Sequence, residues 1–473
     1  MTPSVGLQSK KEECVPQITL GIDIACRAAH QASLADERGV FFWSGRRFRT
    51  THQDLEALWS SLPADSEVTV VMEPTRNAWV VLASWFERKG AKVVMVPSEQ
   101  SADLRDYYFK HTKSDRLDSK ILARIPLLHP EGLYAHEHLG PAVPIRRATR
   151  LRSSLVKRRS EVLGRIDALL EIMGPQWHQV LDLTKRSSLR FCAAGYSDPH
   201  LCRRIGRARL GRFLHRYSHG RFGDPDAVRV LAAAAETLAL WGEELDYGEL
   251  ADDIAVEARL ALSLTLEIDE LEQRIAVMLR ALDPQGILRT VPGVGAIGAA
   301  QILARLGDPN RFRSLAGVRS FSGLVPSLSS SGQNGGHGGP TKSGDALLRE
   351  ALFMSADAAR KIDPTLAQRY HRLMIVNGKH HNSALCHIST ALLTRIVSCW
   401  RSQEPYVIRD LAGQPVTPEE GRRIVHDRFV VSAPLREQRR VTRKNMGTSR
   451  RSKESQRAPS TGPSGPDIRA GAA

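Results

Sequence analysis

Short apolar runs alternate with longer amphipathic segments over residues 17–143. The runs QITLGIDIA, EVTVVMEP and AKVVMVP are rich in Val and Ile, which favour β-strands. The segments AWVVLASWFERKG and SDRLDSKILARI instead place apolar residues three and four positions apart, which predicts helices. Strands that alternate with helices indicate an α/β domain with a mixed sheet, preceded by a flexible segment over residues 1–16.

Residues 144–285 are predicted to be a helical region. Near its end, a stripe of apolar residues follows the three- and four-position spacing that is typical of coiled coils. The stripe consists of Leu264, Ile268, Leu271, Ile275, Met278 and Leu282. Such a stripe forms either one face of an intramolecular helix bundle or the seam of a dimer, and the sequence favours neither.

A second compact, mostly helical unit is predicted over residues 286–400. It opens with PGVGAIGAA, in which Gly293, Gly295 and Gly298 match the spacing of a dinucleotide-binding loop. No βαβ unit surrounds these glycines, so a helix-hairpin-helix is the better interpretation. In that motif Pro292, Gly293 and Gly295 would form a tight turn whose backbone approaches a nucleic-acid phosphate. A purely structural turn is the alternative.

The charge of the chain indicates the class of its partner. The 473 residues include 67 Lys and Arg against 51 Asp and Glu, a net charge of +16. Such a field favours a polyanion such as nucleic acid, and no apolar run approaches the roughly 18 residues of a membrane span. The basic stretch at 200–221 is either a nucleic-acid surface or a solvated helix face. Residues 401–473 are predicted to be a basic, largely disordered tail.

The cysteines indicate a compartment. Six are scattered along the chain with no C-x-x-C pair, which is typical of reduced thiols in the cytoplasm. We therefore expect a cytoplasmic protein that acts on nucleic acid and has neither a disulfide framework nor a zinc knuckle.

Four acidic residues in the first domain form a pattern typical of a metal site. Asp23 lies within the strand run GIDIA, where a buried carboxylate is costly unless it is neutralised, and Glu73 ends another strand run. Asp115 and Asp118 are three positions apart, so a helix presents both on one face. Two Mg²⁺ ions about 4 Å apart would relieve the repulsion among four carboxylates and stabilise both oxygens of a phosphodiester displacement. Each acid alone could instead be an ordinary helix-terminal or strand-end charge.

Residues 323–344, GLVPSLSSSGQNGGHGGPTKSG, have the composition of a flexible linker, although they lie between two segments that look well folded. We predict a mobile loop there. Lys342 in this stretch is a candidate phosphate contact, and the alternative is an exposed loop lysine that binds nothing.

Several motifs follow one another along the chain: GID, MEP, KSDRLD, PGVG, GDPNRF, GLVP followed by SG, and TKSGDALLREAL. This ordered set resembles the DEDD-type insertion-sequence transposases, the bridge-RNA-guided recombinases of bacterial mobile elements, over most of residues 17–400. The resemblance implies that a RuvC-like, RNase H-type domain holds the four acids, which here are Asp23, Glu73, Asp115 and Asp118. It implies a mostly α-helical transposase domain as the second unit.

The resemblance also implies a catalytic serine five residues after the proline of GLVP, which is Ser331, with Ser330 next if the register differs by one. Such a protein cuts and rejoins DNA through a serine–phosphate link. It would use Mg²⁺, a structured guide RNA, and a homodimeric or tetrameric assembly. The alternatives are a metal-dependent nuclease of the junction-resolvase kind with no covalent intermediate, a nucleic-acid-binding protein without activity, and a nicotinamide enzyme based on the glycine triplet alone.

Overall fold

The computed structural model describes residues 16–108, 114–128, 133, 140–331 and 334–438. The chain divides into two compact units, Met1–Gly140 and Pro141–Ala473. The described residues are mostly helical, with a small mixed sheet in the first unit and a two-stranded hairpin in the second. None of the helices described here is both long and apolar enough to cross a membrane.

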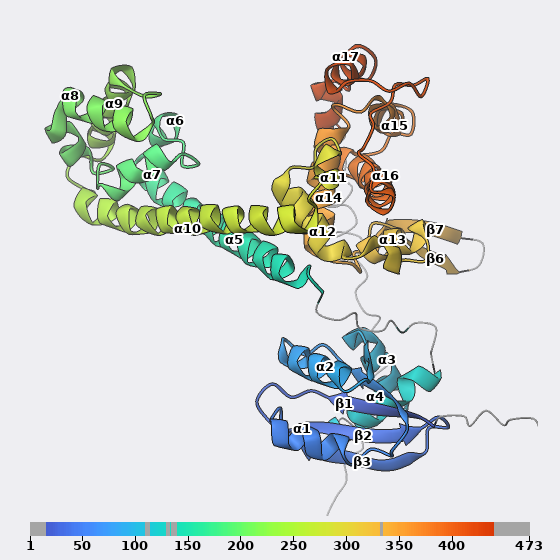
Figure 1. Ribbon diagram of the computed structural model, residues 1–473. Helices are drawn as coiled ribbons and strands as arrows, with labels where there is room; N and C mark the ends of the chain where they lie inside the picture. The colour runs from blue at the N-terminus through green and yellow to red at the C-terminus, as the bar shows by residue number, and fades with distance from the viewer. Residues whose placement is uncertain (1–15, 109–113, 129–132, 134–139, 332–333, 439–473) are drawn as a thin grey trace, which may run out of the picture. The chain divides into compact units, whose positions relative to one another are not determined.

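The first unit contains a five-stranded sheet in the order β3-β2-β1-β4-β5 (Figure 1). Its strands are β1 (Gln17–Asp23), β2 (His30–Asp36), β3 (Phe41–Phe48), β4 (Glu67–Met72) and β5 (Lys92–Met95). Strand β1 pairs antiparallel with β2 and parallel with β4, so the sheet is mixed. This arrangement is compatible with the RNase H-like domain expected from the sequence.

Helices cover both faces of this sheet. They are α1 (His52–Trp59), α2 (Ala78–Arg88), α3 (Ser98–Tyr108) and α4 (Asp115–Leu128). One face buries Leu20 and Met72 in a core with α1 and α2, and the other face buries Val71 in a core with α4. Because successive side chains of a strand point to opposite faces, Gly21 lies on the α4 face, next to Val71 of the paired strand.

Helix α4 approaches β1 closely because residue 21 is glycine. A Cβ atom at Gly21 would lie 2.3 Å from the backbone oxygen of Ser119 and 2.3 Å from the backbone nitrogen of Ala123. Beside this contact, the buried hydroxyl groups of Ser119 and of Ser33 on β2 lie 2.8 Å apart and hydrogen-bond. The missing side chain and the serine pair therefore fix the position of α4 along the sheet.

Two long helices, α5 (Val143–Met173) and α10 (Tyr247–Leu282), pack against each other in the second unit (Figure 1). They run antiparallel, as shown by the ion pairs Arg152–Glu272 and Arg165–Glu257. In the predicted apolar stripe of α10, Ile268 is buried, and Leu271 and Ile275 belong to a core shared with α5. The structure thus supports the intramolecular alternative for this stripe.

Each end of the α5–α10 pair builds its own core. One core contains residues of α6 (Trp177–Val180), α7 (Arg186–Ala193), α8 (Pro199–Tyr217) and α9 (Asp224–Trp241). The other contains residues of α11 (Ile287–Thr290), α12 (Ala296–Leu306), α13 (Leu315–Ser322), α14 (Ala346–Ala359), α15 (Pro364–Ile375) and α16 (His381–Ser402). The long pair therefore carries two separate helical clusters.

The serine- and glycine-rich stretch forms a β-hairpin, so the prediction of a mobile loop was wrong for its described residues. Strand β6 (Pro326–Ser331) pairs antiparallel with β7 (Asn334–Pro340), and residues 332–333 between them lie outside the described part. Glycine and serine have low intrinsic strand propensity, so composition did not reveal a pairing that depends on the partner strand.

Part of the predicted disordered tail is helical. Helix α17 (Pro418–Arg428) lies within it and starts with a capping box, in which Thr417 and Glu420 bond each other's backbone N–H groups. The chain beyond residue 438 and the predicted flexible segment up to residue 15 lie outside the described residues.

We predict that Gly21→Ala destabilises the first unit by about 3 kcal/mol, at the upper end of the cost of overpacking a core, because the added methyl meets backbone atoms that cannot rotate away. Urea unfolding followed by tryptophan fluorescence measures this. The matched control is Gly164→Ala within α5, where a new Cβ meets nothing within 4 Å. That change should stabilise its helix by about 0.5–1 kcal/mol. A Gly21→Ala protein as stable as the wild type would contradict the packing described.

Candidate active site

Asp23 and Glu73 lie at the carboxyl ends of two neighbouring parallel strands. Ile22 of β1 pairs with Met72 of β4, so Asp23 and Glu73 are the next residues on the two chains. Asp23 is two positions after Gly21, and Glu73 is two positions after Val71. Because alternate residues of a strand share a face, Asp23 and Glu73 point to the same α4 face as Gly21 and Val71. Both carboxylates therefore lie on the side of the sheet that α4 covers, and both are partly exposed.

The first turn of α4 supplies the other two acids. The helix begins at Asp115, and the backbone oxygen of Ser114 accepts hydrogen bonds from the N–H groups of Leu117 and Asp118. Asp115 lies one turn before Ser119, the residue fixed against β1 and β2. Gln31, the β2 partner of Asp23, donates to Oδ2 of Asp115 at 3.4 Å. Two strand ends and the first turn of α4 thus carry the four acidic residues, and we call this set of residues the carboxylate corner.

The carboxylate corner offers only oxygen donors, the ligands that suit hard divalent cations. Within the described residues, however, no three His, Cys, Asp or Glu side chains are close enough together to hold a metal ion. Glu73 is engaged elsewhere, since its Oε2 accepts a hydrogen bond from the hydroxyl of Ser101 on α3 at 2.8 Å. The donor chemistry fits a divalent ion, and Glu73 would have to leave Ser101 to join the other acids.

A buried histidine anchors the loop that follows Asp23. The backbone N–H of Ala25 donates to Nδ1 of His30 at 3.2 Å, and Nε2 of the same ring lies 2.7 Å from the hydroxyl of Thr50. Burial lowers the pKa of His30, which favours the neutral ring that this pair of contacts requires. His30 therefore holds the end of β1 in place.

Sequence reasoning did not identify the residues that support the acids. His30, Gln31 and Ser101 are single polar residues with no motif around them. The only available signal was that His30 and Gln31 open the run HQASLAD, which follows GIDIA in the sequence. Their contacts join residues far apart in sequence, which a pattern in one stretch does not show.

The candidate nucleophile lies at the tip of the hairpin. Ser331 is the last residue of β6 and pairs with Asn334, while Ser330 pairs with Gly335. Lys342 follows β7 at the other end of the hairpin, where its N–H donates to the backbone oxygen of Gly323 at 3.0 Å. The five residue-to-residue steps from Pro326 to Ser331 span roughly 17 Å, so the structure does not bring Lys342 next to Ser331.

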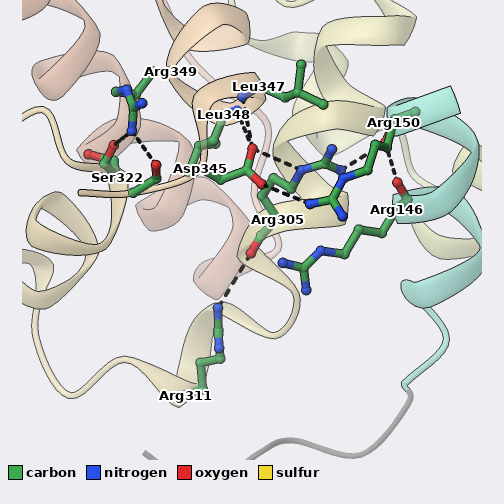
Figure 2. A network of polar contacts seen from close by, with 11 residues as sticks. Arg146, Arg150, Arg305, Arg311, Ser322, Asp345, Leu347, Leu348 and Arg349 are labelled. Carbon is green, nitrogen blue, oxygen red and sulfur yellow. Dashed lines mark hydrogen bonds and ion pairs between the residues drawn. The ribbon is translucent and has the colours of Figure 1, made fainter. Parts of the chain in front are cut away.

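The base of the hairpin is tightly built. Gly323 ends α13 with a positive φ of 67°, and a Cβ there would lie 2.6 Å from the backbone nitrogen of Gly344. The Arg349 guanidinium on α14 donates to the backbone oxygens of Ser322, which precedes the hairpin, and Gly344, which follows it (Figure 2). Arg349 therefore holds together the two segments at the base of the hairpin.

The predicted helix-hairpin-helix is present as α11, a turn and α12, but its glycines have different surroundings. At Gly293, with a φ of 79°, a Cβ would lie 2.4 Å from the backbone oxygen of Ser355 on α14, so this close approach serves packing within the protein. Pro292 is buried. Gly295 precedes α12, is exposed, and has open space where a Cβ would be. A phosphate contact thus stays a prediction for Gly295, while Gly293 fits the structural alternative.

The basic stretch at 200–221 forms α8 and the turn after it. Its exposed cations are Arg203, Arg204, Arg207, Arg209, Arg212, Arg216 and Arg221. Arg207 is paired with Asp224. Next to this helix lies an open hollow of about 570 Å³ whose lining includes Lys185, Tyr217 and Arg221. The surface is basic and concave, and its use for nucleic acid stays a prediction.

Comparison with known proteins identifies the class. A transposase family model for the DEDD-type IS110 transposases matches residues 20–175, which contain the four acids. The model of the transposase IS116/IS110/IS902 family matches residues 285–371, which contain the hairpin. The chain belongs to the DEDD-type insertion-sequence transposases and is a transposase, an enzyme that acts on DNA. Membership in this family implies use of a divalent metal ion.

Its relatives lie in other bacterial insertion elements. The "Insertion element IS110 uncharacterized 43.6 kDa protein" of Streptomyces coelicolor is 24% identical over 412 residues, 84% of this chain and 97% of the relative. The "Insertion element IS116 uncharacterized 44.8 kDa protein" of Streptomyces clavuligerus is 24% identical over 78% of this chain and 91% of the relative. The "Transposase for insertion sequence element IS1328" of Yersinia enterocolitica is 31% identical over 28% of this chain and 39% of the relative.

We predict that Arg349→Met loosens the base of the hairpin without unfolding the protein, because methionine keeps much of the side-chain bulk and loses both hydrogen bonds. Hydrogen exchange at the N–H groups of Thr341 and Lys342, which bond to the opposite leg, should become faster. The control is Arg372→Met, the same change at an exposed position of α15. Unchanged exchange at the hairpin base in Arg349→Met would show that Arg349 does not clamp it.

Proposed function

We propose that this transposase cuts and rejoins DNA strands through a covalent link between Ser331 and a DNA phosphate, and that Asp23, Glu73, Asp115 and Asp118 hold Mg²⁺ for the reaction. The observation that carries the proposal is the carboxylate corner, where two parallel strand ends and one helix start converge. A divalent ion would offset the repulsion among the four acids once Glu73 joins the other three, and their all-oxygen donor set suits Mg²⁺.

The chain's own residues perform the remaining steps. The Ser331 hydroxyl gives its proton to water, and its oxygen forms a bond to the phosphorus. One ester oxygen of the DNA leaves with the bonding electrons and takes up a proton from water. In the reverse direction, a hydroxyl at the end of another strand attacks that phosphorus and releases the serine. Bound Mg²⁺ would stabilise the charge on the phosphate oxygens. The link conserves one phosphodiester bond at each step, so rejoining needs no nucleotide cofactor.

Recognition of DNA sites by a guide RNA is part of the same proposal. It is supported by the resemblance to bridge-RNA-guided recombinases and by the net charge of +16, which attracts RNA and DNA equally. We further propose a dimer or tetramer, because an exchange of strands requires several cuts.

A second candidate is a metal-dependent, structure-specific nuclease that hydrolyses DNA with water. One observation favours it: all four acids belong to the unit Met1–Gly140, whereas Ser331 belongs to Pro141–Ala473. A complete carboxylate site could act within the first unit alone. The two candidates differ in whether the protein becomes attached to DNA.

We expect Ser331→Ala to abolish the covalent protein–DNA adduct, because alanine has no oxygen with which to attack phosphorus. Denaturing electrophoresis of the reaction with labelled DNA, and with the copurified RNA retained, measures the adduct. The matched control is Ser330→Ala, one position earlier on the same strand, which should form the adduct as the wild type does. An adduct that survives in Ser331→Ala and disappears in Ser330→Ala would move the nucleophile by one residue. No adduct with the wild-type protein would favour the nuclease.

We expect Glu73→Gln to reduce metal-dependent DNA cleavage by about 100-fold or more, the scale of losing one electrostatic contact to the transition state. Glutamine keeps the size of the side chain and can still accept from Ser101, but it loses the charge that binds a cation. The control is Glu67→Gln, the same change at the other, exposed end of β4. Equal cleavage by the two variants at saturating Mg²⁺ would remove Glu73 from the metal site.

A further inference from the structure

Four arginines and a single carboxylate lie close together in the second unit. Arg146 and Arg150 come from α5 and Arg305 from α12, and these three lie near Asp345. Arg311, from the short 3-10 helix at Pro309–Arg311, donates to the backbone oxygen of Arg305 (Figure 2). We call these four residues the arginine cluster. The DNA reaction proposed above assigns no role to any of them.

Arg305 forms the floor of the cluster and is fully buried. Its Nε lies 3.2 Å from Oδ1 of Asp345, and its Nη1 donates to the hydroxyl of Thr149 on α5 at 2.9 Å. Its Nη2 is buried with no hydrogen-bond partner in the described part of the chain. Burial lowers the pKa of Arg305, and Asp345 offsets only part of that cost. The groups around Arg305 therefore neutralise its buried positive charge only in part.

Asp345 is already engaged through its Oδ1 atom. Its Oδ1 accepts from the N–H groups of Leu347 and Leu348, and so caps the start of α14. Burial favours its neutral form, but Arg305 and these backbone donors hold the pKa of the carboxyl below its usual value. One carboxylate with its charge already shared among these donors leaves the four arginines with a net excess of positive charge.

The other three arginines are exposed to solvent. Arg150 reaches Asp345 only at 3.9 Å, and the positive charges of Arg146 and Arg305 repel each other. Arg146 and Arg150 are four positions apart on α5, so they share a face. Arg311 is held by the aromatic rings of Phe312 and Phe321, 4.5 and 4.9 Å from its guanidinium carbon.

A structural role accounts for only part of this arrangement. The contacts of Arg305 with Asp345 and Thr149 link α12, α14 and α5. These structural contacts do not require Arg146 or Arg150. Arg146 and Arg150 add repulsion, because like charges at four-residue spacing on a helix destabilise it. An anion bound by Arg146 and Arg150 would offset both this repulsion and the uncompensated charge of the buried Arg305.

We propose that the arginine cluster binds a phosphate of the DNA backbone, with Arg146 and Arg150 in contact with its oxygens and Arg305 beneath them as a fixed charge. Planar guanidinium groups match phosphate oxygens in pairs, which favours a phosphate over a simple halide. The chain is a transposase that acts on DNA. Asp345 directly follows Gly344 at the base of the hairpin, so DNA held here lies beside the hairpin's base. The inference does not depend on Ser331 as the nucleophile.

The test compares two double variants of the full-length protein. Arg146→Gln with Arg150→Gln removes two charges from the cluster. Arg147→Gln with Arg158→Gln removes two exposed charges from another face of the same helix. The affinity for a labelled DNA duplex is measured by fluorescence anisotropy over a series of salt concentrations. The cluster variant should raise Kd about tenfold near physiological salt and reduce the slope of log K against log salt by about 1, as expected for losing one phosphate contact.

Two outcomes of this comparison would overturn the proposal. The first is an equal loss of DNA affinity in both double variants, which would show that the cluster contributes only as general surface charge. The second is an unchanged affinity and salt slope in the cluster variant. A labelled RNA of the same length, measured in parallel, distinguishes the partner: weaker RNA binding with unchanged DNA binding would also overturn the assignment to DNA.

Thermal unfolding separates binding from structure. Removing Arg146 and Arg150 relieves repulsion, so the Tm of the DNA-free cluster variant should equal or exceed that of the wild type. Inorganic phosphate should raise the Tm of the wild type more than that of the cluster variant. A cluster variant whose Tm falls by several degrees, with the same response to phosphate as the wild type, would show that the arginines serve the fold.

Discussion

The close packing of α4 on β1 at Gly21 is the contact on which the carboxylate corner depends. Two backbone atoms of α4 occupy the space where a side chain at residue 21 would lie, and the Ser33–Ser119 hydrogen bond fixes the helix along the strands. Asp115 is one turn before Ser119, so this contact sets how far the first turn of α4 reaches toward Asp23. A helix held further from the sheet would separate the helical acids from the strand acids, although every acid would still be present.

Each unit contains a group of like-charged side chains, negative in the first unit and positive in the second. In the first unit, carboxylates gather at the ends of two parallel strands and at a helix start. In the second, Arg305 is buried beneath Arg146 and Arg150 with one shared carboxylate, Asp345. In both arrangements a counter-ion would offset the repulsion between like charges. We propose a divalent cation as the counter-ion of the first arrangement and a DNA phosphate as that of the second.

The sequence predicted the parts of the site that local patterns encode. The β-rich runs became β1, β4 and β5, and the D-x-x-D spacing put Asp115 and Asp118 in the first turn of a helix. Contacts between distant residues were beyond such patterns. Gln31 meets Asp115 and Arg305 meets Thr149 only after folding. The apolar stripe of α10 did not reveal that α5 covers it, since the same pattern would suit a second chain.

The hairpin was not predictable from the amino-acid composition of its strands. Its strands consist largely of serine and glycine, whose propensities predict a loop, yet backbone pairing between β6 and β7 orders them. What holds the hairpin is at its base, where Gly323 and Gly344 permit close backbone contact and Arg349 bridges the two legs. Gly293 is similar: its motif predicted a phosphate contact, and the space beside it is filled by α14.

Titration of the full-length protein with Mn²⁺, followed by electron paramagnetic resonance, tests most directly whether the carboxylate corner is a divalent-metal site. We expect the wild type to remove free Mn²⁺ from solution and Mg²⁺ to compete for the same site. We expect Asp118→Asn to weaken this binding, whereas Glu67→Gln should not. A wild-type protein that binds no Mn²⁺, or an Asp118→Asn protein that binds it as tightly as the wild type, would contradict the account.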